Sequence, residues 1–242
     1  MLAVAFLLSC TSVERDNPYD SGGINYKKGK PSSSSVKPSS SSSVDYACSN
    51  VGGYSCDMSG YKTAKINGKV WIAENLNCDV EGSYCYNNKT EFCNRYGRLY
   101  DWCTAMAVCT NGWHLPSDEE WQELVDFAGG KFVAGKYLKA KDGWGNEGNG
   151  EDKFGFSALP GGLHQGGSGF INIGYDGFWW SSSVNLKEYT FACSLKMEDD
   201  HESALSDCGY YKRYLFSVRC VKDQLSEPKL SELMNFQNKA EK

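Results

Sequence analysis

The fold is decided by Tyr96–Ala128, which reads YGRLYDWCTAMAVCTNGWHLPSDEEWQELVDFA. Its second half begins after Pro116 with Ser117, and Glu120 follows three residues later, which is the spacing of a helix capping box. In its first half, apolar residues recur at the i, i+3, i+4 and i+7 positions of one helical face, namely Leu99, Trp102, Cys103 and Met106. We therefore predict two helices joined by a tight aromatic turn.

The predicted second helix carries signals at both of its ends. Acidic residues 118–120 place negative charge at the positive end of the helix dipole, and Gly129 with Gly130 ends the segment. Between these ends, one face is apolar and consists of Trp121, Leu124, Val125 and Ala128. We expect this face to pack against a hydrophobic core.

Composition limits the kind of protein this is. The chain has 242 residues, 14% aromatic residues and a net charge of −5, with no basic stripe. Without a basic stripe to neutralise phosphates, nucleic acid is not expected as a partner. Once the polar ends are set aside, about 175 residues remain, which is the size of one ordinary domain.

Ten of the eleven cysteines lie between Cys48 and Cys220. In an exported protein, an even number of cysteines in one domain predicts a disulfide framework, here of up to five bridges. A zinc site is the competing interpretation, but the sequence has no Cys-x-x-Cys pair and no nearby pair of histidines.

The eleventh cysteine, Cys10, ends an apolar stretch that begins at Met1 and resembles the end of a signal peptide. Residues 7–10, Leu-Leu-Ser-Cys, resemble a lipobox, in which the cysteine becomes acylated. We therefore expect residues 1–10 to be a lipoprotein signal segment and Cys10 to anchor the protein to a membrane. The alternative is a cleaved secretory signal in which Cys10 has no role.

Residues 11–47 have no apolar period, and Lys30–Ser43 is almost entirely serine with two prolines. Such a segment cannot bury enough surface to offset its ordering entropy, so we predict a disordered tether with a reach on the order of 30 Å. We place the folded domain at residues 48–223 and a polar tail at 224–242.

Within the domain, the residues 65–76 predict a hairpin, because Asn67-Gly68 is a type I′ turn signal. Alternating or aromatic-rich runs predict further strands at Phe154–Leu159, Gly177–Ser183, Tyr189–Met197 and Tyr214–Val221. Residues 136–140 are predicted to be a short strand or the end of a helix. Helices early in the chain and hairpins late in it indicate an α+β fold.

Several longer motifs occur in one order along the chain. They are WIAENLN at residues 71–77, YGRLYDW at 96–102, NGWHLPSDEEW at 111–121, FGFSALPGG at 154–162, WWSSS at 179–183 and FSVRCV at 216–221. Together they resemble the Fibrobacter succinogenes major paralogous domain over about Cys48–Asp223. The resemblance implies an exported lipoprotein with a poly-Ser linker, lipid-anchored to the outer membrane and surface-exposed. It also implies a C-type-lectin-like domain of the formylglycine-generating-enzyme fold group, with two helices and twisted antiparallel sheets. No activity is established for the family.

The Gly-rich stretch from Asp142 to Asp152 is a candidate calcium loop. Its oxygen-bearing side chains are Asp142, Asn146, Glu147, Asn149, Glu151 and Asp152, and all of these except Glu147 are the predicted ligands. The spacing is not that of an EF-hand, and the alternative is a solvated loop of turn-forming residues. The solvated loop is the commoner case, and the calcium that many C-type lectin folds carry in their long loops adds some support for the metal.

A second candidate site is aromatic. Trp144, Tyr175, Trp179 and Trp180 could form a sugar-stacking surface, although core packing is the commoner role of such residues. Since Trp179 and Trp180 are adjacent in a predicted strand, they should point to opposite faces. His114 could be a catalytic base, but it more closely fits a hydrogen-bonded turn residue, since no nucleophile is placed near it.

Three functions remain open at this stage. The first is a non-catalytic binding or adhesion module for plant-wall polysaccharide or a surface protein. The second is an enzyme of the formylglycine-generating type, which needs active cysteines that cannot be assigned here. The third is a display domain without a ligand.

The disulfide pairing is predicted from several arguments. The short polar or turn-forming sequences between the two cysteines favour Cys85–Cys93, Cys193–Cys208 and Cys48–Cys56 as local bridges. In C-type lectin folds a long-range bridge ties the first helix to the last strand, and the resemblance therefore implies Cys109–Cys220. Elimination leaves Cys78–Cys103, although Cys103 also fits a buried free thiol.

Overall fold

A computed structural model describes Cys48 and residues 52–224 of the chain. All of these residues belong to one unit, Ser39–Lys242, which is described here by itself. The predicted signal segment with Cys10, the tether at 11–47 and the tail beyond Gln224 lie outside the described residues.

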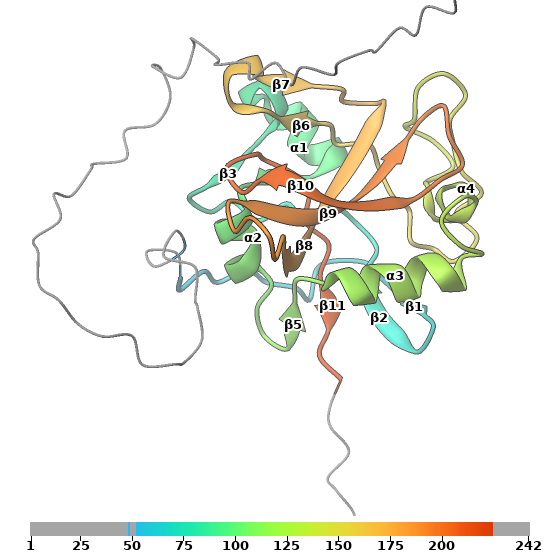
Figure 1. Cartoon of the computed structure of the whole chain (residues 1–242), viewed down its shortest axis with the longest axis horizontal. Helices are drawn as coiled ribbons and strands as arrows, with labels where there is room; N and C mark the ends of the chain where they lie inside the picture. Colours follow the sequence, from blue (N-terminus) through green and yellow to red (C-terminus); the bar gives the residue numbers. More distant parts are fainter. Residues whose placement is uncertain (1–47, 49–51, 225–242) are drawn as a thin grey trace, which may run out of the picture. The chain divides into compact units, whose positions relative to one another are not determined.

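The described part of the chain is a mixed arrangement of four helices and several small antiparallel sheets (Figure 1). The helices are α1 (Thr90–Tyr96), α2 (Trp102–Val108), α3 (Asp118–Phe127) and α4 (Ala134–Leu138). The strands are β1 (Thr63–Ile66), β2 (Lys69–Ile72), β3 (Ser83–Tyr84), β4 (Leu99–Tyr100), β5 (Trp113–His114), β6 (Leu163–His164), β7 (Phe170–Ile171), β8 (Asp176–Val184), β9 (Phe191–Glu198), β10 (Leu205–Tyr211) and β11 (Val221–Lys222). The sheet orders are β1-β2-β11-β5, β10-β9-β8, β3-β4 and β6-β7. The α+β prediction is confirmed at this level, but with four described helices rather than two.

The capping signals of α3 act as predicted. Ser117 Oγ accepts the Glu120 amide at 3.2 Å, and the Glu120 carboxylate accepts the Ser117 amide at 3.0 Å. Trp121, Leu124, Val125 and Ala128 are all buried. Figure 1 shows α3 lying along the β8-β9-β10 sheet, so its apolar face closes one side of the core.

The first predicted helix begins later than expected. Leu99 belongs to strand β4, and α2 starts at Trp102 because Asp101 caps it by accepting the Thr104 amide at 2.8 Å. Met106, which the spacing predicts on the same apolar face as Trp102, is 42% exposed. The apolar residues of this pattern therefore belong to two elements, Leu99 to strand β4 and the other three to helix α2.

The predicted hairpin and two of the four further strands are present, and the other two strands are not. The hairpin turn at Asn67-Gly68 has both φ angles positive, as a type I′ turn requires, and β8 and β9 fall where predicted. Residues 154–159 form no strand, since Gly155 and Ser157 both have positive φ and break the extension. Residues 214–220 form none either, because Leu215, Phe216 and Ser217 bridge to three different segments. Strand β10 was missed, and residues 136–138 form the end of helix α4.

Strand β8 divides the hydrophobic core in two. Trp179 packs with Trp121 and Phe156 on one side of the strand, whereas Trp180 stacks on Phe216 at 4.2 Å on the other. Both tryptophans are fully buried, and their places in two different core clusters confirm that their side chains leave the strand on opposite faces.

Five disulfides staple the domain, and all ten cysteines of the described residues take part. Cys85–Cys93, Cys109–Cys220 and Cys193–Cys208 are present as predicted. The other two pairs were wrong and are Cys48–Cys103 and Cys56–Cys78. Instead of folding back on itself, the segment that holds Cys56 crosses to its neighbours, as the 3.0 Å bonds Tyr54 Oη to Glu81 O and Thr110 Oγ1 to Cys56 O show. Cys48 and Cys56 therefore pair with cysteines of other segments, Cys103 and Cys78, rather than with each other.

Candidate functional site

A polar cleft of about 390 Å³ lies between three segments that are distant in sequence. It is lined by Gly60 and Tyr61 before β1, by Glu74, Asn75 and Asn77 after β2, by Cys93, Asn94, Arg95 and Gly97 at the end of α1, and by Leu159. A volume of this size falls in the range of about 300–1,000 Å³ that is usual for ligand sites.

Asn75 forms the floor of the cleft and is fully hydrogen-bonded. Its Nδ2 donates to Tyr96 O at 2.9 Å and to Leu159 O at 3.0 Å. Its Oδ1 accepts from Trp179 Nε1 at 2.8 Å and from Arg219 Nε at 3.0 Å. Since two donors and two acceptor sites exhaust the amide, Asn75 positions the walls and is not available to a ligand.

Gly97 brings the end of α1 against this floor. Its φ is +76°, and a Cβ at this position would lie 2.7 Å from the Asn75 carbonyl oxygen. Only glycine permits both the backbone conformation and the approach. The disulfide Cys85–Cys93 tethers the same helix, so the wall that carries Asn94 and Arg95 is fixed in place.

The groups that remain for a ligand are both donors and acceptors. Asn77, Asn94 and Arg95 are exposed. Arg95 lies over the Tyr96 ring at 5.4 Å and makes an exposed ion pair with Asp142 at 4.0 Å. Glu74 accepts the Lys62 amide at 3.2 Å and keeps a half-exposed carboxylate. The rim therefore combines one cation, one anion and two amides.

Tyr61 adds a phenol to this rim. Its oxygen accepts the Asn77 amide at 2.9 Å, which leaves the hydroxyl proton to donate. Burial raises the pKa of Tyr61, an effect that the bond from Asn77 opposes and the charge of Glu74 reinforces. The phenol is therefore neutral at physiological pH and acts as a donor.

The aromatic site predicted from the sequence is not formed. Trp144, Trp179 and Trp180 are buried, with their indole nitrogens donating to Ala158 O, Asn75 Oδ1 and Tyr100 O. Only Tyr175 is exposed, at 50%. The prediction was wrong for Trp179 and Trp180 because both faces of β8 are covered. It was wrong for Trp144 because this side chain packs into the core.

The predicted calcium ligands do not converge on one point. Each has its own protein partner: Asp142 lies 4.0 Å from Arg95, Asn146 donates to Asp199, Asn149 accepts the Trp144 amide, Glu151 lies 3.6 Å from Lys136, and Asp152 accepts from Ser157 N and Oγ. Within residues 52–224 no group of three or more His, Cys, Asp or Glu side chains is placed to hold a metal. This donor set does not fit calcium.

A lysine supplies the positive charge in this region instead. Lys139 is 2% exposed, and its ammonium donates to the carbonyls of Gly148, Glu198 and His201. It also lies 4.7 Å from the Trp144 ring. Burial lowers the pKa of Lys139, while Asp199 and other nearby carboxylates act to raise it. The ammonium thus joins the 142–152 loop to the turn after β9, as a bound cation would.

His114 lies between two carboxylates rather than beside a nucleophile. Its Nδ1 is 2.6 Å from Asp223 Oδ1, and its Nε2 is 2.9 Å from Glu120 Oε2. It belongs to strand β5, where it pairs with Val221. The residue therefore ties the end of the domain to the start of α3, in line with a structural role.

The motifs that carry the sequence resemblance all lie in this framework, from Trp71 in β2 to Val221 in β11. The sequence model of the Fibrobacter succinogenes major domain matches residues 64–222, which is most of the described chain. The chain belongs to this family. No curated protein and no solved structure matches it. For this member of the Fibrobacter succinogenes major domain family, the site must therefore be argued from its own residues.

The cleft of this family member was not predicted from the sequence. Its rim residues come from three separate segments, and none of them forms a recognisable binding motif. Asn75 and Asn77 lie in the WIAENLN motif, and their polar spacing after a buried strand was the one available signal.

None of the helices in the described part has the length and apolar character needed to cross a membrane.

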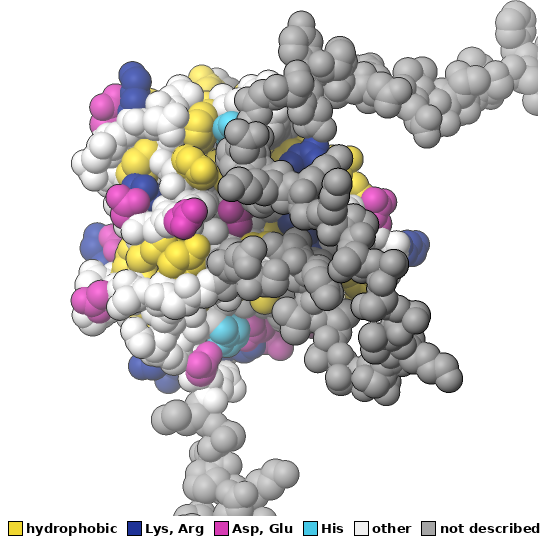
Figure 2. Space-filling model, turned by 90° about the vertical axis from the view of Figure 1, so that its left-hand side faces the viewer, with side chains coloured by type: hydrophobic (Ala, Val, Ile, Leu, Met, Phe, Trp, Pro, Cys, Tyr) yellow, Lys and Arg dark blue, Asp and Glu magenta, His cyan; other side chains and the backbone are white. Residues whose placement is uncertain are grey.

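On the face in Figure 2, basic and acidic side chains are interspersed with small hydrophobic patches.

Proposed function

We propose that this domain is a non-catalytic, disulfide-stabilised binding module that takes a hydroxyl-rich ligand, a polysaccharide segment of the plant cell wall, in the cleft between Tyr61 and Arg95. The observation that carries the proposal is the composition of the rim. The rim offers both donors and acceptors to a cleft of about 390 Å³, and the hydrogen bonds of Asn75 at its floor are already made within the protein.

Sugar hydroxyls are donors and acceptors at once, so they need neighbours of both kinds. The Arg95 guanidinium, the Tyr61 hydroxyl and the amide NH₂ groups donate, whereas the Glu74 carboxylate and the amide oxygens accept. The Tyr61 ring and Leu159 offer apolar surface for the C–H face of a sugar ring. A polyanion fits this cleft less well, because Glu74 carries negative charge into it.

The rim favours binding over catalysis. Glu74 is the single carboxylate among the lining residues, whereas glycoside hydrolysis commonly uses a pair of carboxylates. The formylglycine-generating alternative needs a reactive thiol, and each cysteine of the described residues lies in a disulfide.

We further propose that the module is exported and held at the outer membrane by a lipid on Cys10, with the Ser-rich tether carrying the domain away from the surface. The apolar run before Cys10 supports this proposal. The bridge Cys109–Cys220 between the end of α2 and the segment before β11 supports placing the fold in the C-type-lectin-like group. Cys10→Ala should move the protein from the membrane pellet to the soluble fraction; a variant that stays in the pellet would refute the anchor.

The binding proposal is tested by a pull-down on insoluble plant-wall material with three proteins. Wild type should be retained, and Arg95→Ala should be depleted from the pellet. Arg213→Ala is the matched control, since Arg213 is also an exposed arginine that lies over a tyrosine ring, at 4.5 Å from Tyr211, but outside the cleft. Equal retention of all three proteins, or none of any, would refute the proposal.

A further inference from the structure

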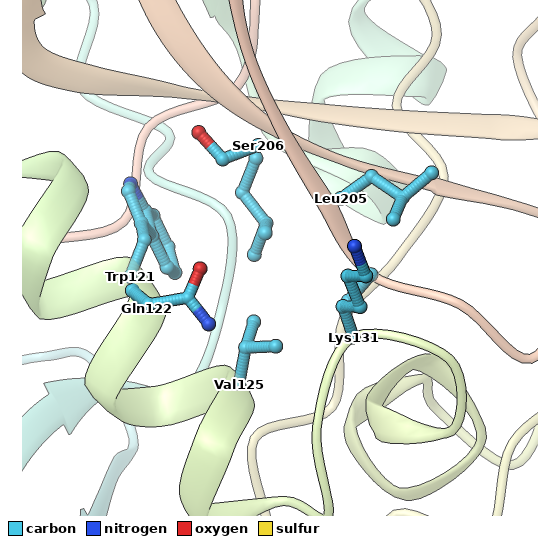
Figure 3. A pocket seen from close by; sticks show the side chains of 8 residues that line it. Trp121, Gln122, Val125, Lys131, Leu205 and Ser206 are labelled. Carbon is cyan, nitrogen blue, oxygen red and sulfur yellow. The ribbon is translucent and has the colours of Figure 1, made fainter.

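A second pocket lies between helix α3 and the edge strand β10. It has a volume of about 230 Å³ and is lined by Trp121, Gln122, Val125, Lys131, Leu195, Ala204, Leu205 and Ser206. Figure 3 shows the labelled side chains arranged around one open space, with α3 on one side and Leu205 and Lys131 opposite. It shares no lining residue with the polar cleft.

The floor of this pocket is apolar and rigid. Trp121, Val125 and Leu195 are at most 2% exposed, and Trp121 is fixed by its Nε1 bond of 3.2 Å to Trp180 O. The disulfide Cys193–Cys208 joins β9 to β10 on the sheet side. This hydrogen bond and this disulfide hold the pocket walls in place.

Two hydrogen bonds join the walls of the pocket. Ser206 Oγ donates to Asp118 at the start of α3. The Ala204 amide donates to Lys131 O at 2.9 Å, just after α3. The volume of about 230 Å³ between these joined walls suits a small molecule better than an extended chain.

Lys131 gives the pocket a charge. Its side chain is exposed, and its ammonium lies 5.0 Å from the Phe132 ring. Among the residues that the structure describes, no carboxylate lies within ion-pair distance of this ammonium. The rim therefore offers a cation whose charge is not neutralised beside an apolar floor.

We propose that this pocket binds a small carboxylate with an apolar body, a single ring or a branched chain, with the acid at Lys131 and the body on Trp121, Val125 and Leu195. The volume sets the size, since it is below the range of about 300–1,000 Å³ of sites for larger ligands. The floor and the ammonium set the two chemical features. The proposal does not depend on the function of the polar cleft.

The test is a titration of the full-length protein with 3-phenylpropanoate, followed through the methyl resonances of Val125 and Leu205. Saturable shifts are expected for the acid. Lys131→Gln should weaken binding of the acid about fivefold, and Lys131→Arg should restore it. Lys141→Gln is the control, since Lys141 is an exposed lysine outside the pocket.

Two further probes separate the two chemical features. The neutral amide 3-phenylpropanamide should bind more weakly than the acid, and Lys131→Gln should leave its affinity unchanged. Acetate has no apolar body and should give no saturable shift. The proposal is overturned if 3-phenylpropanoate gives no saturable shift at about 10 mM, or if Lys131→Gln binds it as wild type does. It is also overturned if acetate reproduces the shifts, because that would show a general anion effect. All substitutions are at exposed residues, so folding of the variants is not in question.

Discussion

The ammonium of Lys139 lies 2.7 Å from the carbonyl oxygen of His201, and the same group donates to Gly148 O at 3.3 Å. These two carbonyls belong to different loops, so one buried side chain joins the 142–152 loop to the turn after β9. The charge is neutralised by backbone oxygens and by the field of nearby carboxylates such as Asp199.

Lys139→Met should destabilise the domain strongly. The methionine fills a similar volume but leaves the three carbonyls without their donor, and each buried unsatisfied group costs about 1–3 kcal/mol. We expect a loss of about 3 kcal/mol in the free energy of unfolding, measured by denaturant titration. Lys136→Met is the control, because its ion pairs with Glu151 and Glu202 are on the surface and should contribute little. If both variants have the same free energy of unfolding as wild type, Lys139 does not stabilise the domain by joining the two loops.

Calcium should not change the melting temperature. A ligand that binds only the folded state raises stability by mass action, but the oxygens of the 142–152 loop already have protein partners. Thermal melts in millimolar calcium and in chelator should therefore coincide. A melting temperature that climbs steadily with calcium would show that the loop rearranges to bind the ion.

Asn75→Ala should be far more damaging than Asn77→Ala. The first change leaves Trp179 Nε1, Arg219 Nε and two carbonyls without the amide that satisfies them, and at least about 3 kcal/mol of stability should be lost. The second removes an exposed rim side chain, so its free energy of unfolding should match that of wild type. The proposed role of Asn75 fails if the two variants are equally stable.

Stability on the acid side should depend on Glu120. Burial acts to raise the pKa of this carboxyl, but hydrogen bonds from Lys69, the Ser117 amide and His114 outweigh it and hold the pKa below 4.5, its ordinary value. Since the folded state binds this proton less tightly than the unfolded state, the contribution is present above the ordinary pKa and is lost as the pH falls through the folded value.

Between about pH 5 and pH 3, wild type should therefore lose more stability than Glu120→Gln, which keeps a capping side chain but has no proton to take up. Glu123→Gln, whose carboxylate also faces Lys69 but is more exposed, should follow the wild-type slope. Parallel acid curves for wild type and Glu120→Gln would contradict this account.

How much the sequence predicts depends on how local the signal is. The capping box of Ser117 and Glu120, the Asn67-Gly68 turn and the Cys85–Cys93 bridge depend on neighbours within a few residues, and all three are correct. Residues 214–220 alternate like a strand, but they pair with several segments in turn, which no local pattern reveals.

The sites were harder to predict for the same reason. Trp179 and Trp180 look like a binding surface until both faces of β8 are known to be covered. The polar cleft is assembled from residues 60–77, 93–97 and 159, so it exists only after folding. The ammonium of Lys139 supplies the positive charge beside the 142–152 loop, for which the sequence suggested calcium. Nothing in the sequence around Lys139 indicates that this side chain is buried.

The most direct test of the central claim is the affinity of the cleft for a soluble wall oligosaccharide that is recovered from the pull-down. Calorimetric titration should give saturable binding for wild type and for Arg213→Ala, and binding at least about tenfold weaker for Arg95→Ala, since the guanidinium donates to the ligand from the cleft rim. Equal affinity of wild type and Arg95→Ala would contradict the account, because it would place the ligand outside the cleft between Tyr61 and Arg95.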